Sequence, residues 1–286
     1  DVYKRQKCTR SVIACPTPTA SEGAPMSSTL KQLMARGTTF GMNIYSTASM
    51  PIEVAGNWGL DFVFIDAEHT SLGVDRDMEK LILAAKCSNI HSLVRVRGTL
   101  DWDIRKALEM GASGVIIPQV HNAEQMRSII RSSKFPPMGR RGGDSSVRSA
   151  NYAGPNFDWG TYTQAENERT VIVPMAESYE FFDNIDAILD VEGIDAVHFG
   201  PADYSLSRQL PVDYRLGNPE VLQRLELLIE KCHARGIQVM VPCFPADGET
   251  AKRLLEMGSD MLLMGSDLSW LNQAGRSIAA VKDQLQ

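Results

Sequence analysis

The chain has 286 residues, of which 43% are hydrophobic and 22% are charged, so it can bury the core of one large α/β domain or of two small ones. Its formal net charge of -6 argues against a nucleic-acid surface, and no apolar run approaches the length of a membrane span. The five cysteines form no close pair and leave an odd one over, which disfavours a disulfide framework or a zinc knuckle and fits a cytoplasmic protein.

Residues 1–27 differ in composition from the rest of the chain. They begin with basic residues, their apolar stretch VIAC is far too short for a secretory signal, and Pro, Thr and Ser follow it. We therefore expect a disordered tail or a non-native extension here, with Met26 as a candidate for the natural start. Residues 28–286 are predicted to form a single barrel domain.

From Thr38 onward, short apolar and β-branched runs alternate with stretches of helical periodicity. The expected strands cover residues 38–45, 61–68, 91–97, 114–120, 170–177, 196–200, 237–244 and 261–267. The expected helices cover residues 74–86, 101–111, 122–133, 178–191, 219–236 and 247–258. This alternation indicates a parallel sheet, and eight strand-to-helix units are what a (β/α)8 TIM barrel requires. A doubly wound open sheet is the alternative, but the segment GMNIYSTASM is not the G-x-G-x-x-G turn that it needs.

Polar residues gather at the ends of the expected strands. In a (β/α)8 barrel the active site lies at the carboxyl ends of the strands, so side chains at these positions point into one shared mouth. The residues at or just beyond these ends are Asp66, Glu68, His69, Arg95, Arg97, Gln119, His121, Glu177, Asp203 and Asp267. Acids, arginines and histidines that are distant in the sequence thus converge, which predicts a site with a metal ion and a base.

Two of these acids are candidate metal ligands. Glu177 taken alone could be the N-cap of the next helix, and Asp203 in the turn GPADYS could bond its own backbone. Taken together, two carboxylates from neighbouring strands without a lysine between them would repel each other unless a cation lies there. Oxygen ligands suit Mg²⁺ or Mn²⁺ and leave positions open for substrate and water.

Two other residues are candidates for the chemistry. His69 could be a surface residue, but Asp66 is near enough in the sequence to orient its imidazole as a base. Arg95 alternates with Val94 and Val96, so it points either into the barrel or at the helical shell, and a buried arginine needs an anion. The expected strands contain no lysine for a Schiff base, which favours metal chemistry over imine chemistry.

A series of motifs resembles the metal-dependent class II pyruvate aldolases of the HpcH/HpaI family. The motifs, in order, are IDAEH, VRVR, IIPQVHNAEQ, FPPMGRRG, MAES, ILDVEGIDAVHFGPADYS and MGSD, and the resemblance extends from Ser28 to the C-terminus. It implies a (β/α)8 barrel of the phosphoenolpyruvate/pyruvate type in which Glu177 and Asp203 hold Mg²⁺, Mn²⁺ or Co²⁺. It further implies that Arg95 faces the pyruvate enolate oxygen and that His69 works with Asp66 in proton transfer.

The resemblance also implies a wider set of substrate contacts. Backbone amides around Gly200 and Ala202 are expected to take the pyruvate carboxylate, and Pro201, Met175 and Gln119 are expected to contact the substrate beside Arg95. The family carries an acid that it lends to the histidine of a neighbouring subunit, and that acid is Glu109 here.

Three positions depart from the family pattern. Met175 replaces the glutamine of Q-x-E, Glu109 is one methylene longer than the usual aspartate, and Arg140 stands beside Arg141. These changes concern aldehyde preference and efficiency more than the chemistry itself.

The activity predicted from this combination is the reversible aldol addition of pyruvate, or of a related 2-oxo acid such as hydroxypyruvate, to an aldehyde, which gives 4-hydroxy-2-oxo acids. One alternative is a CoA-ester lyase of the malyl-CoA or citrate lyase β type, for which the sequence offers no basic cluster beyond Arg140 and Arg141. The other is a non-catalytic barrel that binds a small oxo acid, which only Met175 supports.

The last segment, SDLSWLNQAGRSIAAVKDQLQ, predicts an amphipathic helix that is more apolar than a solvent-covered end of the chain needs. Its apolar residues are Leu268, Trp270, Leu271, Ile278, Ala279, Val281 and Leu285. The resemblance implies that this helix packs on a neighbouring subunit of a homohexamer built as a trimer of dimers. The alternative is that it covers the first and last strands of its own barrel.

Overall fold

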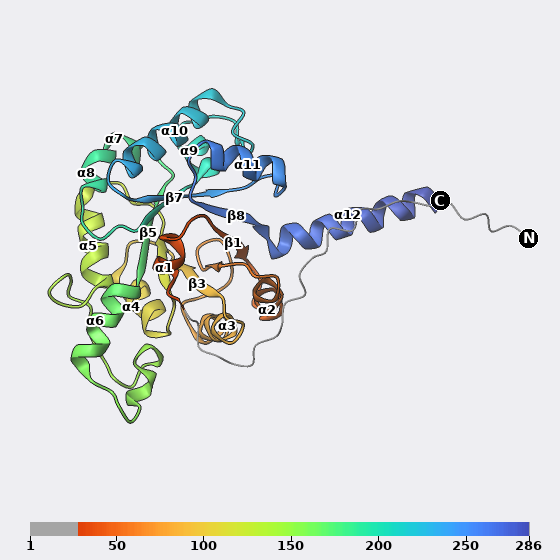
Figure 1. The fold of residues 1–286 in the computed structure, drawn as a ribbon. Helices are drawn as coiled ribbons and strands as arrows, with labels where there is room; N and C mark the ends of the chain where they lie inside the picture. Colours follow the sequence, from red (N-terminus) through yellow and green to blue (C-terminus); the bar gives the residue numbers. More distant parts are fainter. Residues whose placement is uncertain (1–27, 286) are drawn as a thin grey trace, which may run out of the picture.

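The computed structural model describes residues 28–285, and eight parallel strands in it close into a barrel in the order β1 to β8 (Figure 1). The strands are β1 (Thr39–Ile44), β2 (Phe62–Asp66), β3 (His91–Arg95), β4 (Gly114–Ile117), β5 (Val171–Ala176), β6 (Ala196–Phe199), β7 (Gln238–Pro242) and β8 (Met261–Ser266). Every expected strand is present, and the predicted (β/α)8 barrel is confirmed. The expectation of a tail or extension over residues 1–27 lies outside the described residues.

All the described helices except α12 pack around the barrel (Figure 1). The helices are α1 (Leu30–Met34), α2 (Met50–Asn57), α3 (Arg76–Cys87), α4 (Asp101–Glu109), α5 (Ala123–Ser133), the 3-10 helix η1 (Arg148–Ala153), α6 (Trp159–Arg169), α7 (Tyr179–Asp183), α8 (Ile185–Leu189), α9 (Pro201–Ser207), α10 (Pro219–His233), α11 (Gly248–Glu256) and α12 (Asp267–Leu285). The sequence analysis did not predict α1, α2, α6, α9 or η1. Helix α6 lacks an apolar stripe, since its one buried residue is Glu166.

The helix expected over residues 178–191 is two helices instead of one. Asn184 ends α7 and begins α8 with backbone angles outside the helical region, φ -110° and ψ 13°. Its side-chain amide donates to the carbonyl oxygens of Glu180 and His121. Asparagine competes for backbone hydrogen bonds in this way, so it interrupts a helix that the apolar pattern alone would continue.

The strands bury both faces, and the alternation of side chains along them decides which residues reach the barrel interior. Apolar residues that point inward form one cluster, which Leu30 and Met34 of α1 also join. The strand members of this cluster are Phe62, Phe64, Leu93, Ile116, Val171, Val173, Met175, Ala196, Met240, Met261 and Leu263. Continuing the alternation, Asp66 follows Phe64 on the inner face, Arg95 follows Leu93, and Glu177 follows Met175.

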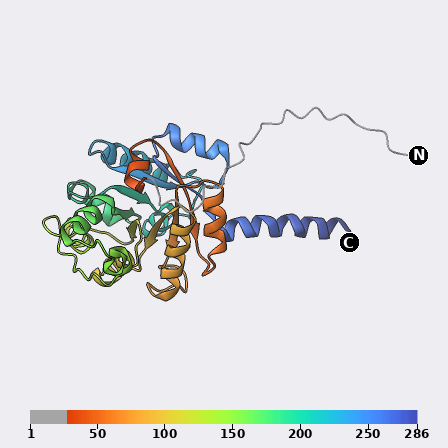
Figure 2. The same cartoon turned by 60° about the horizontal axis from the view of Figure 1, so that its bottom comes forward.

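Helix α12 leaves the barrel directly after β8 and projects away from it (Figures 1 and 2). None of its residues is buried, and Leu271, Ile278 and Leu285 are 70%, 71% and 83% exposed. The alternative in which this helix covers the first and last strands of its own barrel is therefore wrong. Across residues 28–285, no helix is both long enough and apolar enough to span a membrane.

Candidate active site

The innermost polar contact of the barrel mouth is an ion pair between the ends of β2 and β3. Asp66 and Arg95 lie opposite each other in the register of these strands, and both side chains are almost fully buried. Arg95 Nε donates to Asp66 Oδ1 over 2.9 Å, and Nη2 donates to Oδ2 over 2.5 Å. Burial acts to lower the pKa of Arg95, but the hydrogen bonds and charge of Asp66 outweigh it and raise that pKa, so the guanidinium stays charged.

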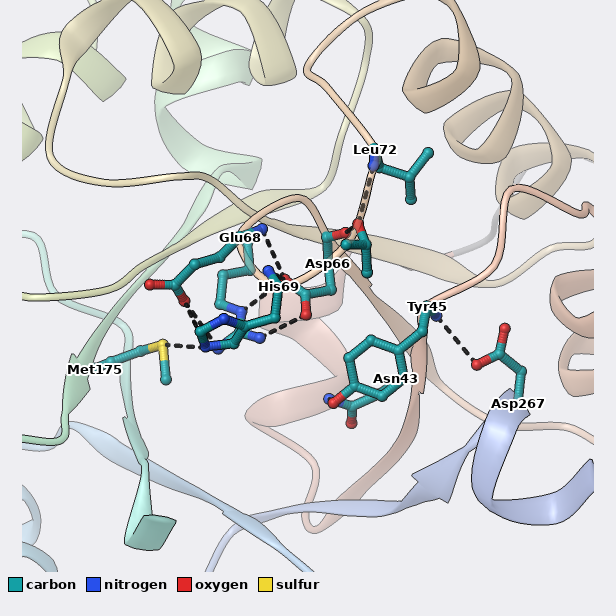
Figure 3. A network of polar contacts seen from close by, with 10 residues as sticks. Asn43, Tyr45, Asp66, Glu68, His69, Leu72, Met175 and Asp267 are labelled. Atoms are coloured by element: carbon teal, nitrogen blue, oxygen red, sulfur yellow. Dashed lines mark hydrogen bonds and ion pairs between the residues drawn. The ribbon is translucent and has the colours of Figure 1, made fainter. Parts of the chain in front are cut away.

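The turn after β2 is organised around the same aspartate (Figure 3). The backbone amides of Glu68 and His69 donate to Asp66 Oδ1 over 2.9 and 3.4 Å. The Asp66 oxygens therefore bind Arg95 and two backbone amides, and Asp66 is linked to His69 through the backbone of the turn. The imidazole of His69 is 57% exposed, and its Nε2 lies 3.7 Å from Glu68 Oε2.

Glu68 is a site residue that the motif comparison did not single out. Its Oε2 lies 3.0 Å from Arg95 Nη1, but the angles are not those of a hydrogen bond, and this buried oxygen has no donor among the described residues. Burial raises the pKa of Glu68, and the charge of Arg95 only partly opposes that rise. Its place at the far end of DFVFIDAEHT was the signal that could have identified it.

Glu177 directly follows β5 and is 5% exposed. Its Oε1 accepts a 2.6 Å hydrogen bond from the backbone amide of Gln119, a residue whose φ of 55° lies in the left-handed region. Burial raises the pKa of Glu177 to about 7; the Gln119 amide opposes this shift, while the charges of Asp203 and Glu68 add to it. Gln119 thus contributes its backbone to the site, whereas its side chain is exposed.

Gly200 allows the fifth and sixth strands to bring their polar ends together. A Cβ atom at this position would lie 2.8 Å from Glu177 Cβ and 3.2 Å from Glu177 Oε2, so only glycine leaves room for the carboxylate. Helix α9 begins at the next residue, Pro201, and carries Ala202 and Asp203 in its first turn. The negative charge of Asp203 acts on both Glu177 and Glu68, which indicates that the three carboxylates share one region of the mouth.

Met175 lies on the inner face of β5 between the arginine and this glycine. Its Sδ is 4.0 Å from Arg95 Nη1, and its Cε would lie 3.5 Å from a Cβ atom on Gly200. A thioether is a weak acceptor, so it satisfies the guanidinium poorly compared with an amide oxygen. The Nη1 donor of Arg95 is consequently less fully used than Nε and Nη2, which both bind Asp66.

The end of β1 adds Tyr45, which the sequence analysis missed although it closes the first expected strand. Asn43 Nδ2 donates to the Tyr45 hydroxyl over 3.3 Å. Burial raises the pKa of Tyr45, and the nearby charge of Arg95 opposes that rise, so the phenol faces the same mouth. Asp267 accepts from the backbone amides of Tyr45 and Ser46 over 3.1 and 3.0 Å, so it fastens the loop after β1. Figure 3 shows the contact with Tyr45.

Three other residues that the sequence analysis named lie outside the polar cluster of the barrel mouth, which Asp66, Glu68, Arg95, Glu177 and Asp203 form. Arg97 forms a two-point ion pair with Asp103 of α4, and the amide of His121 donates to Gln125 of α5. Glu109 ends α4, with its Oε1 3.8 Å from Arg105 Nε. Its expected role toward His69 of a neighbouring subunit stays a prediction.

The sequence pattern of the HpcH/HpaI aldolase/citrate lyase family matches residues 40–274. The chain belongs to this family. A hydroxypyruvate/pyruvate aldolase of Roseobacter denitrificans is 31% identical over 261 residues, which cover 90% of this chain and 97% of that protein. A 2-keto-3-deoxy-L-rhamnonate aldolase of Salmonella typhi is 32% identical over 257 residues, which cover 89% of this chain and 92% of that protein.

The solved structures agree with this assignment. An HpcH/HpaI aldolase from Desulfitobacterium hafniense superposes with a TM-score of 0.80 at 26% identity, covering 91% of this chain and 97% of that one. Both activities in the family's description act on carbon–carbon bonds, and the two relatives named above are aldolases. The predicted family and the predicted class, a carbon–carbon lyase of aldolase type, are therefore confirmed.

Class II aldolases of the HpcH/HpaI family depend on a divalent metal ion, and the residues at this mouth fit one. Glu177, Asp203 and Glu68 gather negative charge that Arg95, already paired with Asp66, opposes only in part, and Glu68 Oε2 is buried without a hydrogen-bond donor among residues 28–285. Within residues 28–285, no group of three or more His, Cys, Asp or Glu side chains is arranged to hold a metal by itself. A site with two carboxylate ligands would leave the other coordination positions to water and substrate oxygens.

Proposed function

We propose that this HpcH/HpaI family member is a divalent-metal-dependent aldolase that adds pyruvate, or a related 2-oxo acid such as hydroxypyruvate, reversibly to an aldehyde. The observation that carries the proposal is the buried Glu177 carboxyl, whose pKa is raised to about 7 by burial and by the neighbouring carboxylates. Such a site favours a dication, because the positive charge offsets both the cost of burying a carboxylate and the repulsion among the neighbouring carboxylates. Its aldolase relatives support the same proposal.

Glu177 and Asp203 are the proposed ligands of Mg²⁺, Mn²⁺ or Co²⁺. When bound, the ion would polarise the ketone of the oxo acid and make its methyl protons more acidic. Backbone amides around Gly200 and Ala202, at the start of α9, would take the substrate carboxylate. Pro201 and the Gln119 backbone would complete the wall around the oxo acid.

Arg95 is the proposed partner of the enolate oxygen. Two of its donor groups bind Asp66, which holds the guanidinium rigidly and leaves Nη1 as the donor best placed for substrate. A preorganised cation of this kind stabilises developing negative charge without having to reorient during the reaction. Asp66 therefore has a positioning role toward Arg95 in addition to its proposed role with His69.

His69 is the proposed proton acceptor and donor. Its imidazole is partly exposed, so it can pass a proton between the oxo acid, the aldehyde oxygen and solvent. Asp66 holds the backbone of the turn, and Glu68 lies beside the imidazole. We expect Glu68 to favour the protonated imidazole that forms after proton removal, because opposite charges within a few ångströms stabilise each other.

Removing the metal is the direct test of this proposal. After dialysis against EDTA, release of pyruvate from 4-hydroxy-2-oxo acids should fall to background, because the ketone loses its polarising cation. Addition of Mg²⁺, Mn²⁺ or Co²⁺ in separate assays should restore it. Full turnover in protein shown by elemental analysis to be free of metal would overturn the proposal, and cleavage of malyl-CoA without aldolase turnover would favour the CoA-ester lyase alternative.

Met175 offers a test of the departure from the family pattern. Replacing Met175 by Gln should lower KM for pyruvate by about two- to tenfold, because a neutral hydrogen bond contributes about 0.5–1.5 kcal/mol. The amide oxygen could also accept from Arg95 Nη1, which now faces a thioether. Met175→Leu keeps the volume without the amide and is the matched control. Steady-state kinetics that give the Gln and Leu variants the same KM would refute the role assigned to this position.

Helix α12 is the basis of a proposal for how subunits of this protein assemble. We propose a homohexamer, a trimer of dimers, in which the exposed apolar side of α12 packs on a neighbouring subunit and Glu109 approaches the His69 of another chain. The support is the row of exposed apolar residues along a helix that contributes nothing to its own core. The proposed substrates are small molecules, and a cytoplasmic location stays a prediction.

Deleting residues from Trp270 onward should release smaller species with little activity, because a site completed across an interface is lost on dissociation. In the full chain, Ile278→Asp should act in the same direction, whereas Gln273→Asp, on another exposed residue of the helix, should not. Light scattering measures the mass. A monomer mass for the full chain at micromolar concentration, with turnover intact, would rule out the shared site.

A further inference from the structure

A polar pocket lies in the helical shell, away from the carboxylates of the mouth. It has a volume of about 360 Å³ and lies between α4, α5 and the loop that follows α5. Four arginines line it, Arg105, Arg131, Arg140 and Arg141, and Asp101 is the one carboxylate in its wall. Nothing in the proposed aldolase mechanism uses these side chains.

The positive charge of this pocket exceeds the negative charge that surrounds it. Glu124 is shared between Arg131 and Arg127, and Glu166 is shared between Arg141 and Arg169. The carboxylate nearest to Arg105 is Glu109, at 3.8 Å, which is too long for a hydrogen bond. Arg140 forms no ion pair within residues 28–285. Such an excess of guanidinium groups around one hollow attracts anions.

Arg141 is the second, independent indication of a ligand. The residue is 4% exposed, its Nη1 donates to Glu166 over 2.9 Å, and its guanidinium lies over the ring of Phe135. Its Nε and Nη2 are buried and have no acceptor among the described residues. Buried donors of a charged group are nearly always satisfied in folded proteins, so two donors without an acceptor leave part of the Arg141 guanidinium unsatisfied in the wall of the pocket.

The backbone holds the pocket in shape. The amide of Arg140 donates to the carbonyl of Arg131 over 2.7 Å, and that of Arg141 donates to Lys134 over 2.8 Å, so the loop is fastened to the end of α5. At Gly142, a Cβ atom would lie 3.3 Å from Arg105 Nη1, so the absence of a side chain lets this guanidinium reach the loop. A ligand would therefore meet donors that are already in place.

We propose that this pocket binds a phosphate-type oxyanion carried by a small molecule. Arginine forks suit the several oxygens of such a group, and the hydroxyls of Ser128 and Ser132 line the same wall. The volume exceeds the space that a phosphate group fills, so the pocket can also hold part of the molecule that carries it. The connection from Arg95 to α4 supplies Thr99 and Leu100 to the pocket, so a bound ligand contacts the segment that follows the proposed enolate-binding residue.

Calorimetric titration of the full chain with inorganic phosphate, at an ionic strength held constant with chloride, tests the proposal. We expect saturable binding that weakens by about tenfold or more in Arg140→Gln and in Arg105→Gln, because each removes a charged donor. Arg127→Gln is the matched control, since Arg127 lies on α5 outside the pocket and also pairs with Glu124. Thermal unfolding of each variant confirms that the fold is intact.

A second titration with coenzyme A distinguishes the possible sources of the phosphate group. Tighter binding of coenzyme A than of phosphate, lost in Arg140→Gln, would identify the nucleotide end of a CoA ester as the ligand. Binding of phosphate without a gain for coenzyme A would identify a small phosphorylated molecule. The proposal is overturned if neither probe saturates, or if Arg127→Gln weakens binding as much as Arg140→Gln does.

Discussion

Replacing Glu177 or Asp203 by alanine is expected to abolish both metal retention and aldolase activity. Each change removes one of the two proposed protein ligands, and a single carboxylate holds a dication far more weakly than two do. Metal analysis of the purified variants and assay of pyruvate release measure the two losses separately. Loss of both properties together is the signature of a shared metal site, since a merely structural acid would not control metal content.

Glu180→Ala is the matched control for this pair. Glu180 lies three residues after Glu177 in the first turn of α7, outside the mouth, so its removal should leave metal content and turnover unchanged. Stoichiometric metal in both the Glu177 and the Asp203 variant would contradict the assignment. In that case the carboxylates would have to act on substrate or structure rather than on a cation.

Replacing Arg95 by lysine is expected to lower activity by about 10²–10³-fold, a magnitude typical of losing one preorganised donor to a developing oxyanion. Lysine keeps the positive charge beside Asp66 but cannot bind that carboxylate at two points and still present a third donor to substrate. Metal content should stay normal because the proposed ligands are untouched. Lysine is preferable to alanine here, since an unpaired buried Asp66 would cost about 3–5 kcal/mol of stability.

Arg97→Lys provides the comparison for Arg95. Arg97 forms the same two-point pair with an aspartate, Asp103, but outside the cluster, so its replacement should leave turnover close to normal. Exchange of deuterium into the methyl group of pyruvate, followed by NMR, isolates the enolisation step. Unchanged exchange in Arg95→Lys would show that Arg95 acts only as the structural partner of Asp66.

Much of the site was predictable because alternation along a strand is a local property. The run DFVFIDAEHT places Phe62, Phe64 and Asp66 on one face and Val63 and Ile65 on the other, and the structure has this arrangement. Sequence alone left open whether Arg95 points into the barrel or at the helical shell. The inward-facing cluster decides this, since Leu93, two residues earlier, lies inside the barrel.

Other features depend on contacts between residues that are far apart in the chain. The partner of Asp66 was expected to be His69, yet its oxygens bind Arg95 and the backbone of the turn. Gln119 was expected to contact the substrate, but its backbone, in a left-handed conformation, donates its amide to Glu177. Asp267 was grouped with the converging acids, but it fastens the loop after β1. Residue type and spacing carry no signal for these choices.

The sequence by itself determined the eight strands and their alternation with helices, because both depend on short-range periodicity. It also determined the polar residues that gather at one end of the barrel, because the carboxyl ends of parallel strands lie together. Only the tertiary structure decided which of these residues meet. Strand register sets Asp66 opposite Arg95, and the missing side chain of Gly200 makes room for Glu177. Tertiary packing also decided that α12 stands away from its barrel, because the direction of a terminal helix depends on long-range contacts that its own apolar pattern does not specify.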